Sequence, residues 1–254
     1  MRRQSPCVGV VAALALLLGL GLPAVPGHAE TVAEGVVQIR LYPLEGDTLL
    51  YRGERTWRES AGEIWEHTVY ATPGGDAVQE TDARFAADTL ELRSFTLRDA
   101  RTGREEDITV QDGRVTLRFV AARGEAAKSE DLAWADDMAA SVTVTHMIRR
   151  QWERLLGGDA VVFDLLVPSR QDTVSFRVRF VAAAEWRGLA VAEFRMEPDS
   201  WLIRALVDPM TFIMDNQDDH ALLEYRGRST IPTADGKDQD LRMVFTSDTK
   251  AVER

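Results

Sequence analysis

Short stretches in which apolar and polar residues alternate recur along this chain and limit what it can fold into. The stretch 48–58 shows the clearest period of two, with apolar Tyr51 and Trp57 on one side and charged Arg52 and Arg58 on the other. Such alternation is typical of a β-strand with one buried face. Further strands are expected at 64–71, 78–85, 90–99, 108–110, 115–119, 161–167, 174–180, 189–196, 210–214, 222–231 and 241–245.

Turn residues stand between these strands at short intervals. Asp112-Gly113 is the dipeptide that supplies the positive backbone angles of a type I′ hairpin turn. Pro73 to Asp76 and Pro232 to Gly236 are turn signals of the same kind. Parallel strands need long crossover connections, so these short ones predict antiparallel pairing. The near-continuous apolar stretch 161–167 is expected to be a central strand.

One segment, 129–156, has a helical character instead. Its apolar residues recur at steps of three and four and would share one face of a helix packed on the sheet. These residues are Val144, Met147, Ile148, Trp152 and Leu155. Gly157-Gly158 then provides a C-terminal stop, because glycine adopts the left-handed cap conformation without strain.

About a dozen strands and one main helix predict a mainly β protein. A large twisted antiparallel sheet tends to curl, so we expect a curved sheet or open barrel that wraps the helix. The alternative is a two-sheet β-sandwich. No linker or repeat divides the chain after residue 29, so 30–254 is expected to be a single β-rich domain.

The first 29 residues have the layout of a secretory signal peptide. Arg2 and Arg3 precede an apolar run from Val8 to Leu22, and Gly27-His28-Ala29 ends in small residues at the cleavage positions. The run is shorter than the 18 or so residues of a membrane span. We therefore expect export to the periplasm with Glu30 as the first mature residue. Cys7 precedes the apolar run, so no lipid anchor is expected.

Cysteine content and charge exclude several classes of function. Cys7 is the only cysteine, so residues 30–254 can form neither a disulfide nor a thiolate metal site. The net charge is −11, and loss of Arg2 and Arg3 with the signal peptide makes it −13. Such an acidic chain is not expected to bind nucleic acid or anionic lipid surfaces. We expect no cofactor.

Three segments resemble an uncharacterised family of bacterial envelope proteins, of the domain-of-unknown-function kind. They are Trp152 to Pro168, which runs from the helix end into a strand, then Glu197 to Leu202, and Glu224 to Gly227. Proteins of this family are loosely similar to periplasmic lipoprotein carriers. The resemblance implies a curved antiparallel sheet around a helix and brings no established activity.

The sequence contains no catalytic motif. No serine lies in a G-x-S-x-G nucleophile elbow, and no glycine-rich phosphate loop occurs. His67, His146 and His220 lack a second histidine at ligand spacing, so we interpret them as structural. The polar run from Asp215 to His220 could offer oxygens to a hard cation, but it is better explained as a turn. We therefore expect neither an enzyme nor a metal site.

The remaining candidate is a cavity on the concave face of the sheet. An apolar or lipid-like molecule could bind there, with the apolar segment 201–206 as a wall or lid. The residues expected to line this site are Trp57, Trp65, Trp201, Leu202 and Leu206. The alternative is a structural or protein-interaction role with an envelope protein as partner, and a hydrolytic enzyme is the least favoured. A hollow lined by carbon atoms would favour the ligand, and a filled core with an exposed apolar edge would favour the partner.

Overall fold

The computed structural model describes residues 33–204, 207–217 and 219–247. The expected signal peptide at 1–29 and the candidate site residue Leu206 lie outside these described residues. None of the helices in the described part of the chain has the length and apolar character needed to cross a membrane.

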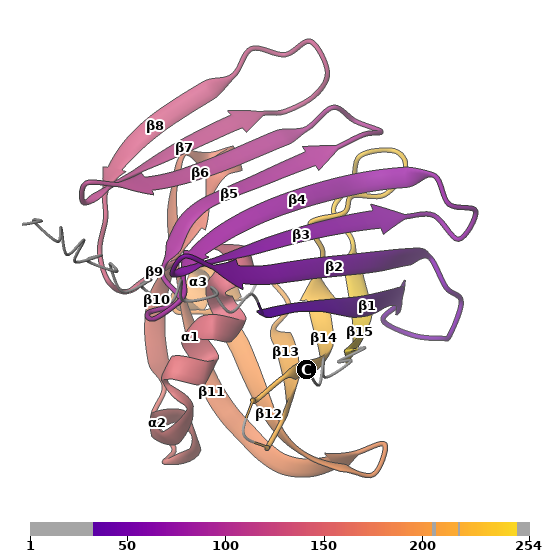
Figure 1. Ribbon diagram of the computed structural model, residues 1–254, viewed down its shortest axis with the longest axis vertical. Helices are drawn as coiled ribbons and strands as arrows, with labels where there is room; N and C mark the ends of the chain where they lie inside the picture. The colour runs from indigo at the N-terminus through magenta and orange to yellow at the C-terminus, as the bar shows by residue number, and fades with distance from the viewer. Residues whose placement is uncertain (1–32, 205–206, 218, 248–254) are drawn as a thin grey trace, which may run out of the picture. The chain divides into compact units, whose positions relative to one another are not determined.

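Fifteen strands form one sheet in the order β8-β7-β6-β5-β4-β3-β2-β1-β15-β14-β13-β12-β11-β10-β9 (Figure 1). Each strand pairs antiparallel with its neighbours, except for a short parallel pairing of β9 with β10. The strands are β1 (Ala33–Pro43), β2 (Tyr51–Ser60), β3 (Glu63–Ala71), β4 (Ala77–Ala86), β5 (Leu92–Asp99), β6 (Glu105–Gln111), β7 (Arg114–Val120), β8 (Lys128–Ala133), β9 (Met138–Ala139), β10 (Val161–Val167), β11 (Asp172–Trp186), β12 (Leu189–Pro198), β13 (Met210–Asp215), β14 (Leu222–Arg228) and β15 (Asp240–Ser247).

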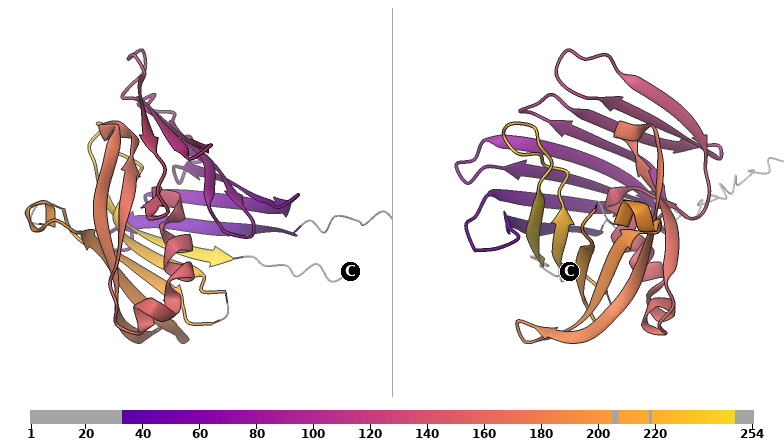
Figure 2. Two further views of the ribbon diagram at one scale, coloured as in Figure 1. Left: turned by 90° about the vertical axis from the view of Figure 1, so that its left-hand side faces the viewer. Right: turned by 180° about the vertical axis from the view of Figure 1, so that it is seen from behind.

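The sheet is strongly curved but open. Its two edge strands, β8 and β9, follow each other in the chain and are joined only by residues 134–137. Five extended residue steps span at most about 18 Å, so the sheet must curl until its edges lie within that distance at this point. Figure 2 shows this curl from the side and from behind. The predicted curved antiparallel sheet is thus confirmed, and the two-sheet sandwich is not formed.

Local sequence explains the tight hairpins. Asp112 and Gly113 have φ values of 51° and 72°, as a type I′ turn between β6 and β7 requires. Ala61 and Gly62 between β2 and β3 also have positive φ, at 53° and 75°. Two-residue turns fix the register, so the face to which each side chain of these strands points is also fixed.

The helical segment is shorter than predicted. Helices α1 (Val144–Arg150) and α2 (Trp152–Leu156) follow a 3-10 turn at Ser141–Thr143, and a break at Gln151 separates them. The prediction of a helix from residue 129 is wrong, because 128–133 forms edge strand β8 against β7. The predicted apolar stripe is confirmed, since Val144, Met147, Ile148, Trp152 and Leu155 are all buried. Gly158, with φ of 96°, takes the left-handed position after α2.

The core lies on one face of the sheet, which we call the inner face. Helices α1 and α2 pack there against β10 to β13, with Leu155 and Phe194 both completely buried. A second cluster lies under β4 to β7, and a third lies under β1 and β15. The stretch 161–167 was expected to be a central strand, but β10 has only the two-residue β9 beyond it. Val162 alternates with the buried Val161 and Phe163, so it points to the opposite face and is 52% exposed.

Candidate functional site

The predicted ligand-binding residues that the structure describes do not form one site. Trp57 is half-buried on the inner face, where its indole ring covers Gly35 of β1. Trp65 pairs with Arg58 of β2, which is one position from Trp57, so it points to the opposite, outer face. Trp201 and Leu202 lie on the one-turn helix α3 (Trp201–Arg204) and are 74% and 59% exposed. These two side chains of the segment 201–206 therefore face solvent.

The inner face is filled rather than hollow. At one side it is covered by α1 and α2, as the core contacts of Trp152 and Leu155 show. At the other side it is covered by the loop 229–239, which connects β14 to β15. Ile231 of this loop is completely buried among apolar residues of the sheet. These are Ile39, Leu41, Tyr70, Val78, Leu241, Met243 and Phe245.

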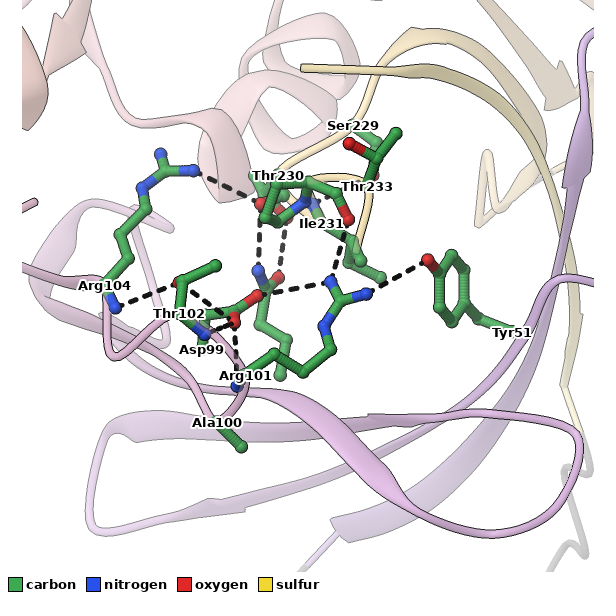
Figure 3. Close-up of polar contacts among 12 residues, drawn as sticks. Tyr51, Asp99, Ala100, Arg101, Thr102, Arg104, Ser229, Thr230, Ile231 and Thr233 are labelled. Atoms are coloured by element: carbon green, nitrogen blue, oxygen red, sulfur yellow. Dashed lines mark hydrogen bonds and ion pairs between the residues drawn. The ribbon is translucent and has the colours of Figure 1, made fainter. Parts of the chain in front are cut away.

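Polar contacts hold the loop 229–239 against the turn between β5 and β6 (Figure 3). Arg101 donates through Nη2 to the backbone oxygen of Pro232 at 2.8 Å. Arg104 donates through Nη1 to the backbone oxygen of Thr230 at 3.4 Å. Gln79 donates to the same oxygen at 2.9 Å and accepts from the Thr230 hydroxyl at 2.8 Å. We call Gln79, Arg101 and Arg104 the latch.

Asp99 is the buried carboxylate of this region, with a fully covered side chain. Its Oδ1 accepts hydrogen bonds from the backbone N–H groups of Arg101 and Thr102 at 3.0 and 2.9 Å, and from the Thr102 hydroxyl at 3.1 Å. Arg101 Nη2 lies 3.4 Å from its other oxygen. A carboxylate that is satisfied by its own turn in this way orders the turn and positions the latch. Glu106 plays a similar part for Arg104, with which it forms an ion pair.

Two cavities lie near these elements. One of about 160 Å³ is beside the latch and is lined in part by Gln79, Asp99 and Arg104. Another of about 20 Å³ lies between Leu90 and Trp134. Pockets for drug-sized ligands hold about 300–1,000 Å³ and are mostly apolar. Neither cavity therefore accommodates a lipid-like molecule as it stands.

A polar patch interrupts the apolar inner face near α1. Arg55 Nε of β2 lies 3.9 Å from a Glu66 oxygen, and its guanidinium lies over the Phe245 ring at 5.8 Å. His146 of α1 is buried with its ring edge against Phe85, 4.7 Å between centroids. Burial, together with the nearby positive charges of Arg149 and Arg55, lowers the pKa of His146 to about 3. His146 is therefore neutral at any physiological pH.

Two buried polar atoms of this patch lack a hydrogen bond. Arg55 Nε and His146 Nδ1 have no hydrogen-bond partner among the described residues. Arg149 is also largely buried, and burial lowers its pKa. Its Nε donates to the backbone oxygen of His220 at 3.1 Å. The sequence does not reveal this patch, because Arg55 occupies an inward position of a strand in which Arg52, Glu54 and Arg58 face outward.

The other two histidines differ in their surroundings. His220 stacks on Trp152 at 3.7 Å between centroids. In the loop that contains His220, Asp215 accepts a hydrogen bond from the backbone N–H of Gln217, and Asp219 accepts one from that of Ala221. Such contacts are typical of a turn. His67 lies on the outer face within reach of two carboxylates, and this proximity could not be seen in the spacing along the sequence.

Comparisons with known proteins give neighbours of similar fold only. No family model matches the sequence, and no curated protein matches it. A β-barrel-like protein of the domain-of-unknown-function family DUF1849 from Brucella abortus is 11% identical, with a TM-score of 0.47. The match covers 84% of this chain and 94% of that protein. A putative outer membrane lipoprotein-sorting protein domain from Vibrio parahaemolyticus is 8% identical, covers 87% of each chain, and has a TM-score of 0.24. A DUF1329 family protein from Desulfovibrio piger is 7% identical, covers 86% of this chain and 85% of its own, and has a TM-score of 0.24.

These neighbours are of the kind that the sequence resembles, namely domains of unknown function and a lipoprotein-sorting domain. None of the three names refers to an enzyme. With identities of 7–11% and TM-scores below 0.5, the likeness transfers neither ligand nor activity.

Proposed function

We propose that this protein is exported to the periplasm and binds an apolar or lipid-like molecule on the inner face of its sheet. The observation that carries the proposal is the loop 229–239. It places one apolar side chain, Ile231, into a cluster of sheet residues, yet it forms no strand of the sheet itself. An apolar ligand could displace a loop that is attached in this way and occupy the volume that Ile231 leaves.

The latch supports this proposal by its chemistry. Its contacts to the loop run mainly from side chains to the backbone oxygens of Thr230 and Pro232, with one further contact to the Thr230 hydroxyl. Each hydrogen bond of Gln79 contributes about 0.5–1.5 kcal/mol net, and each one donated by the charged Arg101 or Arg104 about 1.5–3 kcal/mol, because water replaces it when the loop lifts. The loop can therefore open without disturbing the strands. Arg55 stands at the border of the same cluster, over Phe245, where it would meet a polar end of the ligand.

The proposal is tested by uptake of a fluorescent fatty-acid analogue. Arg101→Ala combined with Arg104→Ala should speed uptake, because the loop then loses two of its latch contacts. Arg118→Ala is the matched control, since Arg118 pairs with Glu105 and Asp107 and not with the loop. If neither the natural chain nor the double variant takes up the probe, the binding proposal fails.

The second candidate is a protein-interaction role in the envelope. It is favoured by the exposure of Trp201 and Leu202 on α3, two large apolar side chains that contribute nothing to the core. A photo-crosslinking residue placed at 201 in intact cells would test it. Specific adducts with one envelope protein would support this role. If no adduct forms and the probe is taken up, only the ligand proposal is supported.

A further inference from the structure

The hairpin of β3 and β4 brings a histidine and two carboxylates together on the outer face of the sheet. His67 on β3 lies directly opposite Asp82 on β4 in the antiparallel register. Glu80 precedes Asp82 by two residues, so its side chain points to the same face. Each of the three residues offers one ligand atom, and these atoms lie within 4.8 Å of one another. No other group of this kind occurs among residues 33–204, 207–217 and 219–247.

The hydrogen bond to Asp82 fixes the state of the imidazole. His67 Nδ1 lies 3.0 Å from Asp82 Oδ1. An ionised carboxylate only accepts hydrogen bonds, so Nδ1 must carry the proton. In the neutral ring, Nε2 then holds the lone pair, and Nε2 is the atom that faces Glu80. A carboxylate that orients a histidine through its other nitrogen is the usual outer partner of a metal-binding histidine.

The distance from His67 Nε2 to Glu80 Oε1 is 3.6 Å. This separation is too long for a good hydrogen bond. Two ligands bound to one tetrahedral Zn²⁺ at about 2.0–2.1 Å would lie about 3.4 Å apart. A shift of a few tenths of an ångström in the exposed Glu80 side chain would therefore allow both atoms to contact the same ion.

Neighbouring side chains hold the imidazole in place, and no arginine forms an ion pair with the two carboxylates in the described part of the chain. Trp65 stacks on the His67 ring at 5.6 Å between centroids and 6° between planes, which limits rotation of the imidazole. Two arginines lie nearby, but each has another partner. The Arg58 guanidinium lies over the Trp65 ring, and Arg98, which is opposite Glu80 in the register, forms an ion pair with Asp107. The ion pairs that Glu80 and Asp82 form in the described part of the chain are both with His67.

We propose that His67 and Glu80 bind a divalent transition-metal ion of the Zn²⁺ and Cu²⁺ class, with Asp82 as the positioning residue for His67. Imidazole nitrogen and carboxylate oxygen together suit these ions better than Mg²⁺ or Ca²⁺, which prefer oxygen alone. Water completes the coordination, because the site is partly exposed on the outer face. This site does not depend on a ligand on the inner face.

The first test is calorimetric titration of the untagged full chain with Zn²⁺ at pH 7.5. We expect one saturable site that is lost in His67→Gln. Glu80→Gln should weaken binding at least tenfold, and Asp82→Asn by about 10–100-fold, as is usual for an outer partner of a metal ligand. Glu54→Gln is the matched control, because Glu54 is an exposed carboxylate of β2 that accepts a hydrogen bond from Gln38 and does not contact His67.

A second measurement uses Trp65 as a local reporter. Cu²⁺ at the site should quench the fluorescence of Trp65, and Trp65→Phe should remove that quenching while Zn²⁺ binding persists. Circular dichroism would verify that each variant keeps its strand content. The proposal is overturned if the natural chain binds no Zn²⁺, or if His67→Gln binds it with unchanged affinity. In either case the three residues form only an ion-paired cluster.

Discussion

The substitution Ile231→Ala tests whether the loop 229–239 opens independently of the sheet. Ile231 is completely buried, and the change removes three carbon groups from the apolar cluster under β1 and β15. At about 0.8 kcal/mol for each buried CH₂, the closed loop loses about 2.4 kcal/mol. Since about 1.4 kcal/mol corresponds to a factor of ten, the open population should rise about 50-fold.

Hydrogen exchange measures this population directly, because an amide exchanges in proportion to the fraction of time that it is open. The reporters are the backbone N–H groups of Ser229 and Thr233, which donate to Gln239 and Lys237 within the loop. Their exchange should accelerate about 50-fold in Ile231→Ala. Amides in the centre of β12 should be unaffected. Leu189→Ala, which truncates a side chain that is 43% exposed, is the control and should change neither set.

The reasoning is refuted if the amides of the loop and of β12 accelerate by the same factor. That result would mean that the loop opens only when the whole domain unfolds. Local opening has a consequence for binding as well. A ligand that binds only the open state gains apparent affinity in proportion to the open fraction. Ile231→Ala should therefore bind a fatty-acid analogue more tightly than the natural chain does.

Four further outcomes follow from burial, charge and the amino-terminal sequence. Leu155→Ala should cost about 2–5 kcal/mol in urea denaturation, because Leu155 of α2 is fully buried against the sheet, and a loss below about 0.5 kcal/mol would contradict that packing. Trp201→Ala should change stability by less than about 0.5 kcal/mol, and a loss of several kcal/mol would show that Trp201 is a core residue. The pKa of His146 falls from 6.5 to about 3 on folding, so only the unfolded chain takes up this proton between those values. Stability should then decline on acidification below pH 6.5 by up to about 1.4 kcal/mol per pH unit, and His146→Gln should flatten this slope; an unchanged slope would contradict it. Protein recovered from the envelope should begin at Glu30 without lipid, whereas an intact Met1 would rule out the expected cleavage.

The strands and their turns were predictable because each depends on a few neighbouring residues. The alternation around Tyr51 and Trp57 and the Asp112-Gly113 turn correspond to β2 and the β6–β7 hairpin. Strand β1 was not predicted, although its Val37, Ile39 and Leu41 alternate with polar residues. Strand β8 was mistaken for helix because it is an exposed edge strand that has little apolar content and is specified by its pairing with β7.

The site was harder to predict because register decides which side chains meet. Trp57 and Trp65 have an even spacing of eight, which suggests a common face in one continuous strand. The two-residue turn at Ala61-Gly62 instead places Trp57 opposite Glu66, and Trp65 then points to the other side. The register of β3 and β4 likewise places His67 opposite Asp82, which is fifteen positions later in the sequence. A correct assignment of the turns would have revealed both relations.

The pairing of β1 with β15 carries a consequence for how the chain reaches this structure. Nearly every other strand pairs with a neighbour in sequence, but Val37 pairs with Ser247 across almost the whole chain. Contacts between such distant residues form late, because a large loop must close before they are gained. Until then β1 and β15 are two unprotected edges of separate half-sheets, each able to pair with another chain. The joining of these two strands is therefore the step at which folding competes with aggregation.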